Sequence, residues 1–220
     1  MTEVAAALTE VRDRIVAAAR GAGRDPDAVR VVAATKTVPA ERVADVIALG
    51  VSDIGENRAQ ELLGKAAALE ALASVTPAEV CWHFLGRLQR NKVRSLAPRV
   101  TWWQSVDREP LGVAIARHAP GARVLVEVNL AGEQQKGGCA PGDAARLIDA
   151  FRQAGLRVEG LMAIPPAADD PRPWFAELRE LAGELRVHEL SMGMTDDFEA
   201  AVAEGATMVR IGRAIFGARA

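Results

Sequence analysis

The sequence predicts a single α/β domain, folded as a closed (β/α)8 (TIM) barrel with an extra N-terminal helix, over residues 1–220. Short apolar or β-branched runs alternate with amphipathic stretches along the whole chain. Such alternation implies parallel strands joined by right-handed crossovers, and eight repeats of the unit favour a closed barrel over an open sheet. A length of 220 residues is also enough for one large domain.

The expected strands are the apolar runs at Arg30–Thr35, Asp53–Gly55, Trp82–Leu85, Thr101–Val106, Arg123–Asn129, Val158–Ile164, His188–Met192 and Met208–Ile211. The expected helices are Val4–Ala19, Glu41–Leu49, Arg58–Leu72, Asn91–Leu96, Leu111–His118, Gly142–Ala154, Trp174–Leu185 and Asp196–Glu204. Several helices end just before a strand in a glycine, at Gly50, Gly155 and Gly205, where glycine relieves left-handed backbone strain. A doubly wound sheet is the alternative, but its dinucleotide form needs a Gly-x-Gly-x-x-Gly turn where Lys36-Thr37-Val38 stands.

Composition argues against several classes of protein. The formal charge is −2, with 27 basic and 29 acidic residues, so nucleic acid and membrane surfaces are poor candidates as partners. The segment Met1–Arg20 lacks the apolar core of a signal peptide, and no run reaches transmembrane length. Cys81 and Cys139 have no ligand spacing, so neither a disulfide nor a metal site is expected. We therefore expect a cytoplasmic protein with free thiols.

Lys36 is the residue with the clearest chemical meaning. It follows the first expected strand and precedes the helix that Pro39 opens, which places its amine at the carboxyl edge of the barrel. An amine there can form a Schiff base if partial desolvation lowers its pKa. A lysine in such a loop, taken alone, is usually an ordinary solvated side chain, and only the rest of the chain favours the chemical role.

The ends of the last two strands have the features of a phosphate site. The glycines of Ser191-Met192-Gly193 and Arg210-Ile211-Gly212-Arg213 let backbone N–H groups approach an anion, and Ser191 adds a hydroxyl donor. A helix after the eighth strand would point its positive end inward. Together with Lys36, this pattern predicts an aldehyde cofactor that carries a phosphate.

Six segments resemble the pyridoxal-phosphate homeostasis protein family, whose barrel is similar to the N-terminal domain of alanine racemase. They are Ala34–Pro39, Gly55–Glu61, His83–Lys92, Gly160–Pro165, Leu190–Asp197 and Val209–Gly217. Their order and spacing cover almost the whole chain. The resemblance implies that the protein binds pyridoxal 5'-phosphate (PLP) without an established enzymatic reaction.

The resemblance also implies roles for individual residues. Lys36 would carry PLP as an internal aldimine, and Ser191 with the backbone of Gly212 and Arg213 would hold the phosphate. Arg210 would face the pyridine nitrogen, and Asn57 would line the ring pocket. These residues bind the cofactor; none is expected to be catalytic.

Two of these positions have physical consequences. An arginine at the pyridine nitrogen keeps that nitrogen unprotonated, so the ring of PLP bound beside Arg210 is a weaker electron sink. Relatives usually carry a small hydroxyl residue where this chain has Arg213. The arginine could replace the lost hydroxyl contact by a charge-assisted bond or turn outward to solvent.

A PLP-dependent amino-acid racemase is the alternative function. Alanine racemase uses a tyrosine from a second domain as the base opposite its lysine, whereas this chain contains no tyrosine and ends at Ala220, just after the last expected strand. We therefore expect a PLP carrier, with PLP-dependent enzymes as possible recipients. The absence of a partner domain suggests a monomer.

Other polar residues have two possible interpretations each. Lys136 could reach the mouth of the barrel as a second amine for cofactor exchange, or remain an ordinary loop lysine. The run Arg87, Arg90, Lys92 and Arg94 could bind an anion, although such runs are usually solvated helix faces. His83 and His188 are expected to be hydrogen-bonded imidazoles of the core.

Overall fold

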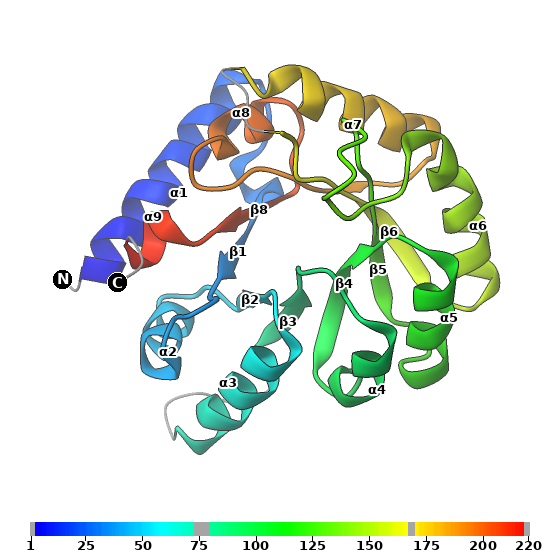
Figure 1. Ribbon diagram of the computed structural model, residues 1–220. Helices are drawn as coiled ribbons and strands as arrows, with labels where there is room; N and C mark the ends of the chain where they lie inside the picture. Colours follow the sequence, from blue (N-terminus) through cyan, green and yellow to red (C-terminus); the bar gives the residue numbers. More distant parts are fainter. Residues whose placement is uncertain (1–2, 73–79, 167–169, 218–220) are drawn as a thin grey trace.

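Parallel strands close into one barrel in sequence order, as the computed structural model of residues 3–72, 80–166 and 170–217 shows (Figure 1). The strands are β1 (Arg30–Ala34), β2 (Asp53–Glu56), β3 (Cys81–Phe84), β4 (Val100–Val106), β5 (Arg123–Glu127), β6 (Arg157–Met162), β7 (Glu189–Ser191) and β8 (Met208–Ile211). Pairing of β8 with β1 closes the barrel, for example through Val32 and Arg210. The predicted barrel is confirmed, and the alternative of a doubly wound sheet is wrong.

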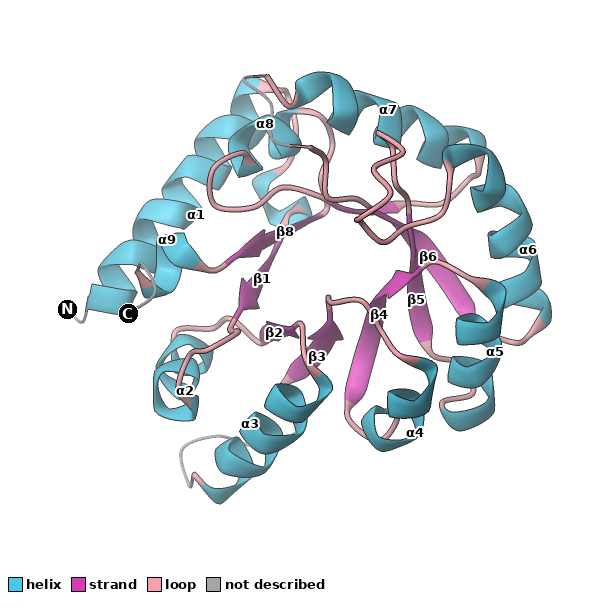
Figure 2. Cartoon of the chain, viewed as in Figure 1, coloured by secondary structure: helices cyan, strands magenta, loops and turns pink. Residues whose placement is uncertain are grey.

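Helices surround the strands on the outer face (Figure 2). They are α1 (Glu3–Gly21), α2 (Ala40–Ala48), α3 (Ala59–Ala71), α4 (Val93–Leu96), α5 (Glu109–His118), α6 (Ala144–Gln153), α7 (Arg172–Glu184), α8 (Phe198–Ala203) and α9 (Arg213–Phe216). Short 3-10 turns are η1 (Pro26–Ala28), η3 (Arg90–Lys92) and η4 (Pro141–Asp143). The turns η3 and η4 make up the first residues of two expected helices, because Pro141 and the tight turn at Arg90 start each segment in 3-10 geometry.

The N-terminal helix forms because its apolar residues recur every three or four positions. Val4, Leu8, Val11, Ile15 and Ala19 all lie on its buried face. This face packs against α8 and α9, so α1 covers the region where the first and last strands meet. No helix in the described part of the chain is long and apolar enough to cross a membrane.

Three glycines end helices as the sequence predicts. Gly50, Gly155 and Gly205 have φ angles of 84°, 84° and 112°, a region that side chains with a Cβ rarely adopt. Each glycine turns the chain from a helix into the strand that follows. The predicted fifth strand is shorter than expected, because it ends at Glu127 and Val128 makes only an isolated bridge with Cys139.

The barrel has two distinct packing regions. The outer faces of the strands and the inner faces of the helices form the large core, while a smaller cluster fills the barrel itself. That cluster contains Val32, Leu85, Trp102, Leu125, Met162 and Met208. Buried polar side chains lie beside it, including His83, Gln104 and Ser191, each 0% exposed. Buried polar groups need hydrogen-bond partners, so these residues constrain one another.

Candidate functional site

Lys36 lies in the turn that follows β1, as the sequence predicts. Its side chain is exposed, which differs from the partial desolvation expected of a lysine that forms a Schiff base. Its neighbour Thr37 has a φ angle of 65°, so the turn is tight. A cavity of about 730 Å³ opens beside Lys36 and is lined by residues from the β1–α2 segment and from the β8–α9 segment. We call it the β1/β8 cavity; its lining residues are Ala34, Lys36, Thr37, Val38, Pro39, Arg42, Gly212, Arg213, Phe216 and Gly217.

The charge of the β1/β8 cavity suits an anionic ligand. Lys36 and Arg42 contribute two cationic groups, and no carboxylate belongs to the described residues that line it. The guanidinium of Arg213, a third lining residue, is paired with Asp196. Gly212 lies close to the first strand, because a Cβ at this position would be 3.0 Å from the carbonyl oxygen of Ala34. The predicted lysine therefore shares one cavity with two of the three predicted phosphate-binding residues.

Ser191 and Arg210 lie next to each other inside the barrel. Arg210 donates a hydrogen bond from Nη1 to Ser191 Oγ at 2.8 Å and another from Nη2 to the carbonyl oxygen of Ala163 at 2.9 Å. Burial lowers the pKa of Arg210 to about 10, while the charges of Asp197 and Glu127 act in the opposite direction. The guanidinium therefore stays protonated at neutral pH and is held in a fixed orientation.

The side chain of Arg213 is turned toward solvent at the edge of the β1/β8 cavity. It pairs with the carboxylate of Asp196 and is 57% exposed. Of the two possibilities that the sequence leaves open, the structure thus favours the outward one. The N–H of Arg213 begins α9, where the first amide groups of a helix lack partners within it, so an anion contact through the backbone is still available.

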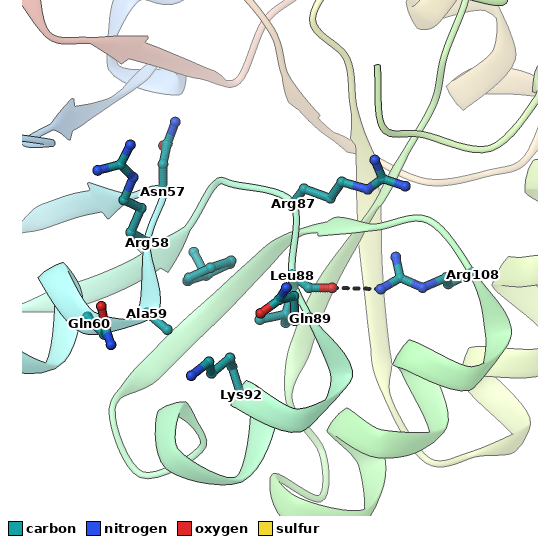
Figure 3. A pocket seen from close by; sticks show the side chains of 10 residues that line it. Asn57, Arg58, Ala59, Gln60, Arg87, Leu88, Gln89, Lys92 and Arg108 are labelled. Carbon is teal, nitrogen blue, oxygen red and sulfur yellow. Dashed lines mark hydrogen bonds between the residues drawn. The ribbon is translucent and has the colours of Figure 1, made fainter. Parts of the chain in front are cut away.

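Asn57 lines a different pocket from Lys36. Figure 3 shows Asn57 and Arg58 on one side of this pocket and Arg87 and Gln89 on the other. The pocket has a volume of about 680 Å³ and lies where β2 and β3 end. The predicted contact of Asn57 with a bound ring stays a prediction.

The expected basic run is divided between two pockets. Lys92 lines the pocket of Asn57, whereas Arg90 lines a neighbouring pocket that is formed with residues of α5.

Glu127 is a polar residue of the barrel that the sequence reasoning missed. It is the last residue of β5 and is 8% exposed. Burial raises its pKa to about 7, with a further rise from Asp107, while Arg210, Arg87 and Arg108 lower it. An acidic residue that ends an otherwise apolar strand was the available signal, but the expected strand continued to Asn129 and hid it.

Lys136 reaches the end of a neighbouring strand. Its Nζ donates to the carbonyl oxygen of Pro165 at 3.1 Å, just beyond β6, and pairs with Glu133 Oε2 at 2.5 Å. Asn129 shapes the same loop, because it bonds to both the N–H and the carbonyl oxygen of Glu133. Lys136 is thus tethered near the carboxyl ends of the strands.

The two histidines expected in the core behave differently. His83 is fully buried and hydrogen-bonded, as expected. The expectation for His188 is wrong: its side chain is exposed, because β7 begins only at Glu189.

A closed barrel with a lysine after its first strand and a cationic, glycine-lined cavity at its last strand has the architecture of the alanine racemase N-terminal domain. Residues 7–220 match the family described by that name. Curated relatives identify a particular family within this class. A pyridoxal phosphate homeostasis protein of Pseudomonas aeruginosa is 44% identical over 100% of this chain and 97% of its own length. One of Aquifex aeolicus is 41% identical over 96% of each chain. This chain belongs to the pyridoxal phosphate homeostasis protein family.

Solved structures agree with this assignment. PipY of Synechococcus elongatus, solved with PLP bound, superposes with a TM-score of 0.83 at 32% identity and covers 98% of this chain and 100% of its own. A lysine decarboxylase of Selenomonas ruminantium shares only the fold, with a TM-score of 0.65 at 18% identity.

Proposed function

We propose that this protein binds PLP and takes part in PLP (vitamin B6) homeostasis, with Lys36 as the covalent attachment point. The observation that carries the proposal is the β1/β8 cavity, in which Lys36 from the first strand shares one space with Gly212 and Arg213 from the last. The family and the PLP-bound PipY structure support the identity of the ligand.

The residues of the cavity fit an aldehyde that carries a phosphate. Lys36 supplies an amine that can form a Schiff base with the aldehyde of PLP. Arg42 and the backbone of Gly212 and Arg213 would supply positive charge and hydrogen-bond donors for the phosphate. Ser191, which lies inside the barrel beside Arg210, would add a hydroxyl donor from outside the cavity lining. Arg210 would face the pyridine nitrogen, and Asn57 would line the ring pocket.

In this proposal the protein holds and releases PLP and has no dedicated catalytic reaction. Relatives at 38–44% identity carry the name of homeostasis proteins, which supports a carrier over a racemase. The fixed Arg210 cation also supports it, because it would leave the ring nitrogen of PLP unprotonated. We place the protein in the cytoplasm as a monomer that delivers PLP to PLP-dependent enzymes.

Borohydride trapping tests the attachment point. Sodium borohydride converts a lysine–PLP imine into a stable amine, so the wild-type protein should gain the mass of one pyridoxyl phosphate group, on the peptide that contains Lys36. The Lys36→Ala variant should show neither the added mass nor the visible absorption band. The matched control is Lys136→Ala, which removes another lysine near the carboxyl ends of the strands and should keep the label on Lys36. A stoichiometric label that persists in Lys36→Ala would refute the assignment.

A further inference from the structure

A chain of hydrogen bonds crosses the interior of the barrel from the proposed cofactor site to the opposite mouth. Ser191 Oγ donates to Gln104 Oε1 at 2.6 Å. Gln104 Nε2 lies 2.7 Å from His83 Nδ1, and His83 Nε2 lies 2.7 Å from Asp53 Oδ1. Arg210 donates to Ser191 at the other end. The complete chain is Arg210, Ser191, Gln104, His83 and Asp53.

All the hydrogen bonds of this chain point in the same direction. Because Gln104 Oε1 accepts from Ser191, the NH₂ group of Gln104 faces His83, and Nδ1 of that ring must accept. The hydrogen of His83 is then on Nε2 and is donated to the carboxylate of Asp53. The chain therefore runs from the Arg210 cation to the Asp53 anion.

The chain ends at the amino-terminal mouth of the barrel. Asp53 is the first residue of β2, its side chain is 16% exposed, and it pairs in register with Cys81, the first residue of β3. Other charges near His83 are Arg30 at the start of β1 and Glu189 at the start of β7. The amino-terminal mouth is therefore polar and borders solvent at Asp53.

Asp53, Cys81 and His83 also have the residue types of a metal site, with donor atoms within 4.8 Å of one another. The separation of 2.7 Å between Asp53 Oδ1 and His83 Nε2 is that of a hydrogen bond. Two ligands of one tetrahedral zinc ion would be about 3.3 Å apart, given metal–ligand distances near 2.0–2.1 Å. The cluster is therefore arranged as part of the hydrogen-bond chain.

The direction of the chain conflicts with phosphate binding by Ser191. The hydroxyl has a single hydrogen, and that hydrogen is donated to Gln104. To donate to a phosphate oxygen, Ser191 must turn its hydrogen away, which would leave Gln104 Oε1 buried without a donor and is unfavourable. Rotation of the Gln104 amide by half a turn removes this cost, because its NH₂ group then donates to Ser191.

Rotation of the Gln104 amide changes which ring nitrogen of His83 must carry a hydrogen. Gln104 Oε1 would face His83 Nδ1, so Nδ1 needs a hydrogen, while Nε2 still faces the carboxylate of Asp53. Both ring nitrogens then make hydrogen bonds, to Gln104 and to Asp53, when His83 and Asp53 together hold one more proton. Burial lowers the pKa of His83, so the pair lacks this proton at neutral pH until the chain reverses.

We propose that binding of a phosphate group at Ser191 reverses this hydrogen-bond chain and adds one proton to the His83–Asp53 pair at the opposite mouth. Asp53, His83 and Gln104 are then positioning residues of the cofactor site, although they touch no ligand. The inference rests on the proposed function, because it takes Ser191 as a phosphate donor. It predicts that PLP binding takes up a proton far from the cofactor.

The Asp53→Asn variant tests whether reversal of the hydrogen-bond chain requires an added proton. Its amide can donate to His83 Nε2 without an added proton, so the chain can reverse freely in this variant. Titration calorimetry of PLP at pH 7.5, in two buffers of different ionisation enthalpy, counts the protons taken up. The wild type should take up about one proton more than Asp53→Asn, because only the wild-type His83–Asp53 pair needs an added proton when the chain reverses. Protons that PLP itself gains or loses on binding are counted equally in both proteins, so they cancel in this difference.

Three comparisons give the test its controls. With pyridoxal, which lacks the phosphate, the two proteins should take up equal numbers of protons. The control Asp149→Asn makes the same chemical change at an exposed residue of α6 and should keep the wild-type proton count with PLP. Gln104→Leu removes the acceptor of the Ser191 hydrogen and interrupts the chain, so it should abolish the extra proton uptake with PLP. Equal proton counts for wild type and Asp53→Asn with PLP would overturn the inference, whereas a wild type that binds no PLP would overturn the proposed function itself.

Discussion

The hydroxyl of Thr35 donates to Glu56 Oε1 at 2.6 Å, and both residues are fully buried. Lys65 of α3 completes this group: its Nζ donates to the carbonyl oxygen of Thr35 at 2.6 Å and pairs with the same carboxylate. Because Thr35 immediately precedes Lys36, the ion pair between β2 and α3 fixes the backbone from which the proposed PLP-binding lysine extends.

Breaking this ion pair should destabilise the fold. Glu56→Leu leaves the Lys65 cation buried without its partner and should lower the free energy of unfolding by about 3–5 kcal/mol. The double variant Glu56→Leu/Lys65→Met removes both charges and should recover much of the loss. Urea unfolding of the wild type and the three variants, including Lys65→Met alone, measures the effect. A double variant less stable than Glu56→Leu would contradict the explanation.

Gly86 allows the loops after β2 and β3 to approach each other closely. A Cβ at this position would lie 2.1 Å from the carbonyl oxygen of Asn57. Gly86→Ala should therefore push the Asn57 backbone aside and lower stability by about 1–3 kcal/mol. The control is Gly64→Ala in α3, where a Cβ would meet nothing within 4 Å. This substitution should raise stability by about 0.5–1 kcal/mol, because alanine is favoured over glycine inside a helix. Equal thermal shifts for the two variants would argue against the close approach.

Glu127 should make stability depend on pH. Its pKa is about 7 in the folded protein and near 4.5 without burial, so the folded state binds more protons than the unfolded state between these values. Relative to higher pH, Glu127 therefore contributes favourably to the free energy of unfolding below about pH 4.5, and this contribution is lost as the pH rises through 7. Glu127→Gln removes this dependence and should gain up to about 3 kcal/mol over the wild type between pH 5 and pH 8. Urea unfolding at both pH values measures the difference; a gain that shrinks toward pH 8 would refute the assignment.

The protein should not racemise amino acids at the rate of an enzyme. The chain has no tyrosine to act as an opposing base, and Arg210 would leave the ring nitrogen of PLP unprotonated. The measurement is exchange of the α-proton of L-alanine in deuterated water, followed by NMR with PLP-loaded protein. Turnover near about 10 per second, lost in Lys36→Ala, would favour a racemase instead.

The sequence predicted the barrel because strand and helix periodicities are local properties. The expected strand Met208–Ile211 matches β8 at both ends, since Gly205 and Gly212 flank a short run in which Arg210 is the only charged residue. The expected fifth strand was too long, because Val128 and Asn129 have strand-like neighbours but belong to the loop that returns at Cys139.

Long-range polar contacts could not be predicted in the same way. Gln104 is the clearest case: its partners Ser191 and His83 are 87 and 21 residues away in sequence. The available signal was a glutamine inside an otherwise buried strand, next to Trp102 and Trp103. That pattern shows that a partner is needed but not which one.

The pairing of β8 with β1 also limits when the protein can first hold its cofactor. Lys36 is among the first residues of the barrel to leave the ribosome, whereas Ser191, Arg210 and Gly212 are among the last. A nascent chain has Lys36, the proposed attachment point, for most of its synthesis, but it lacks the opposite wall of the cavity until β8 has joined β1. Stable loading with PLP would therefore follow completion of the barrel and serve as a chemical marker of it.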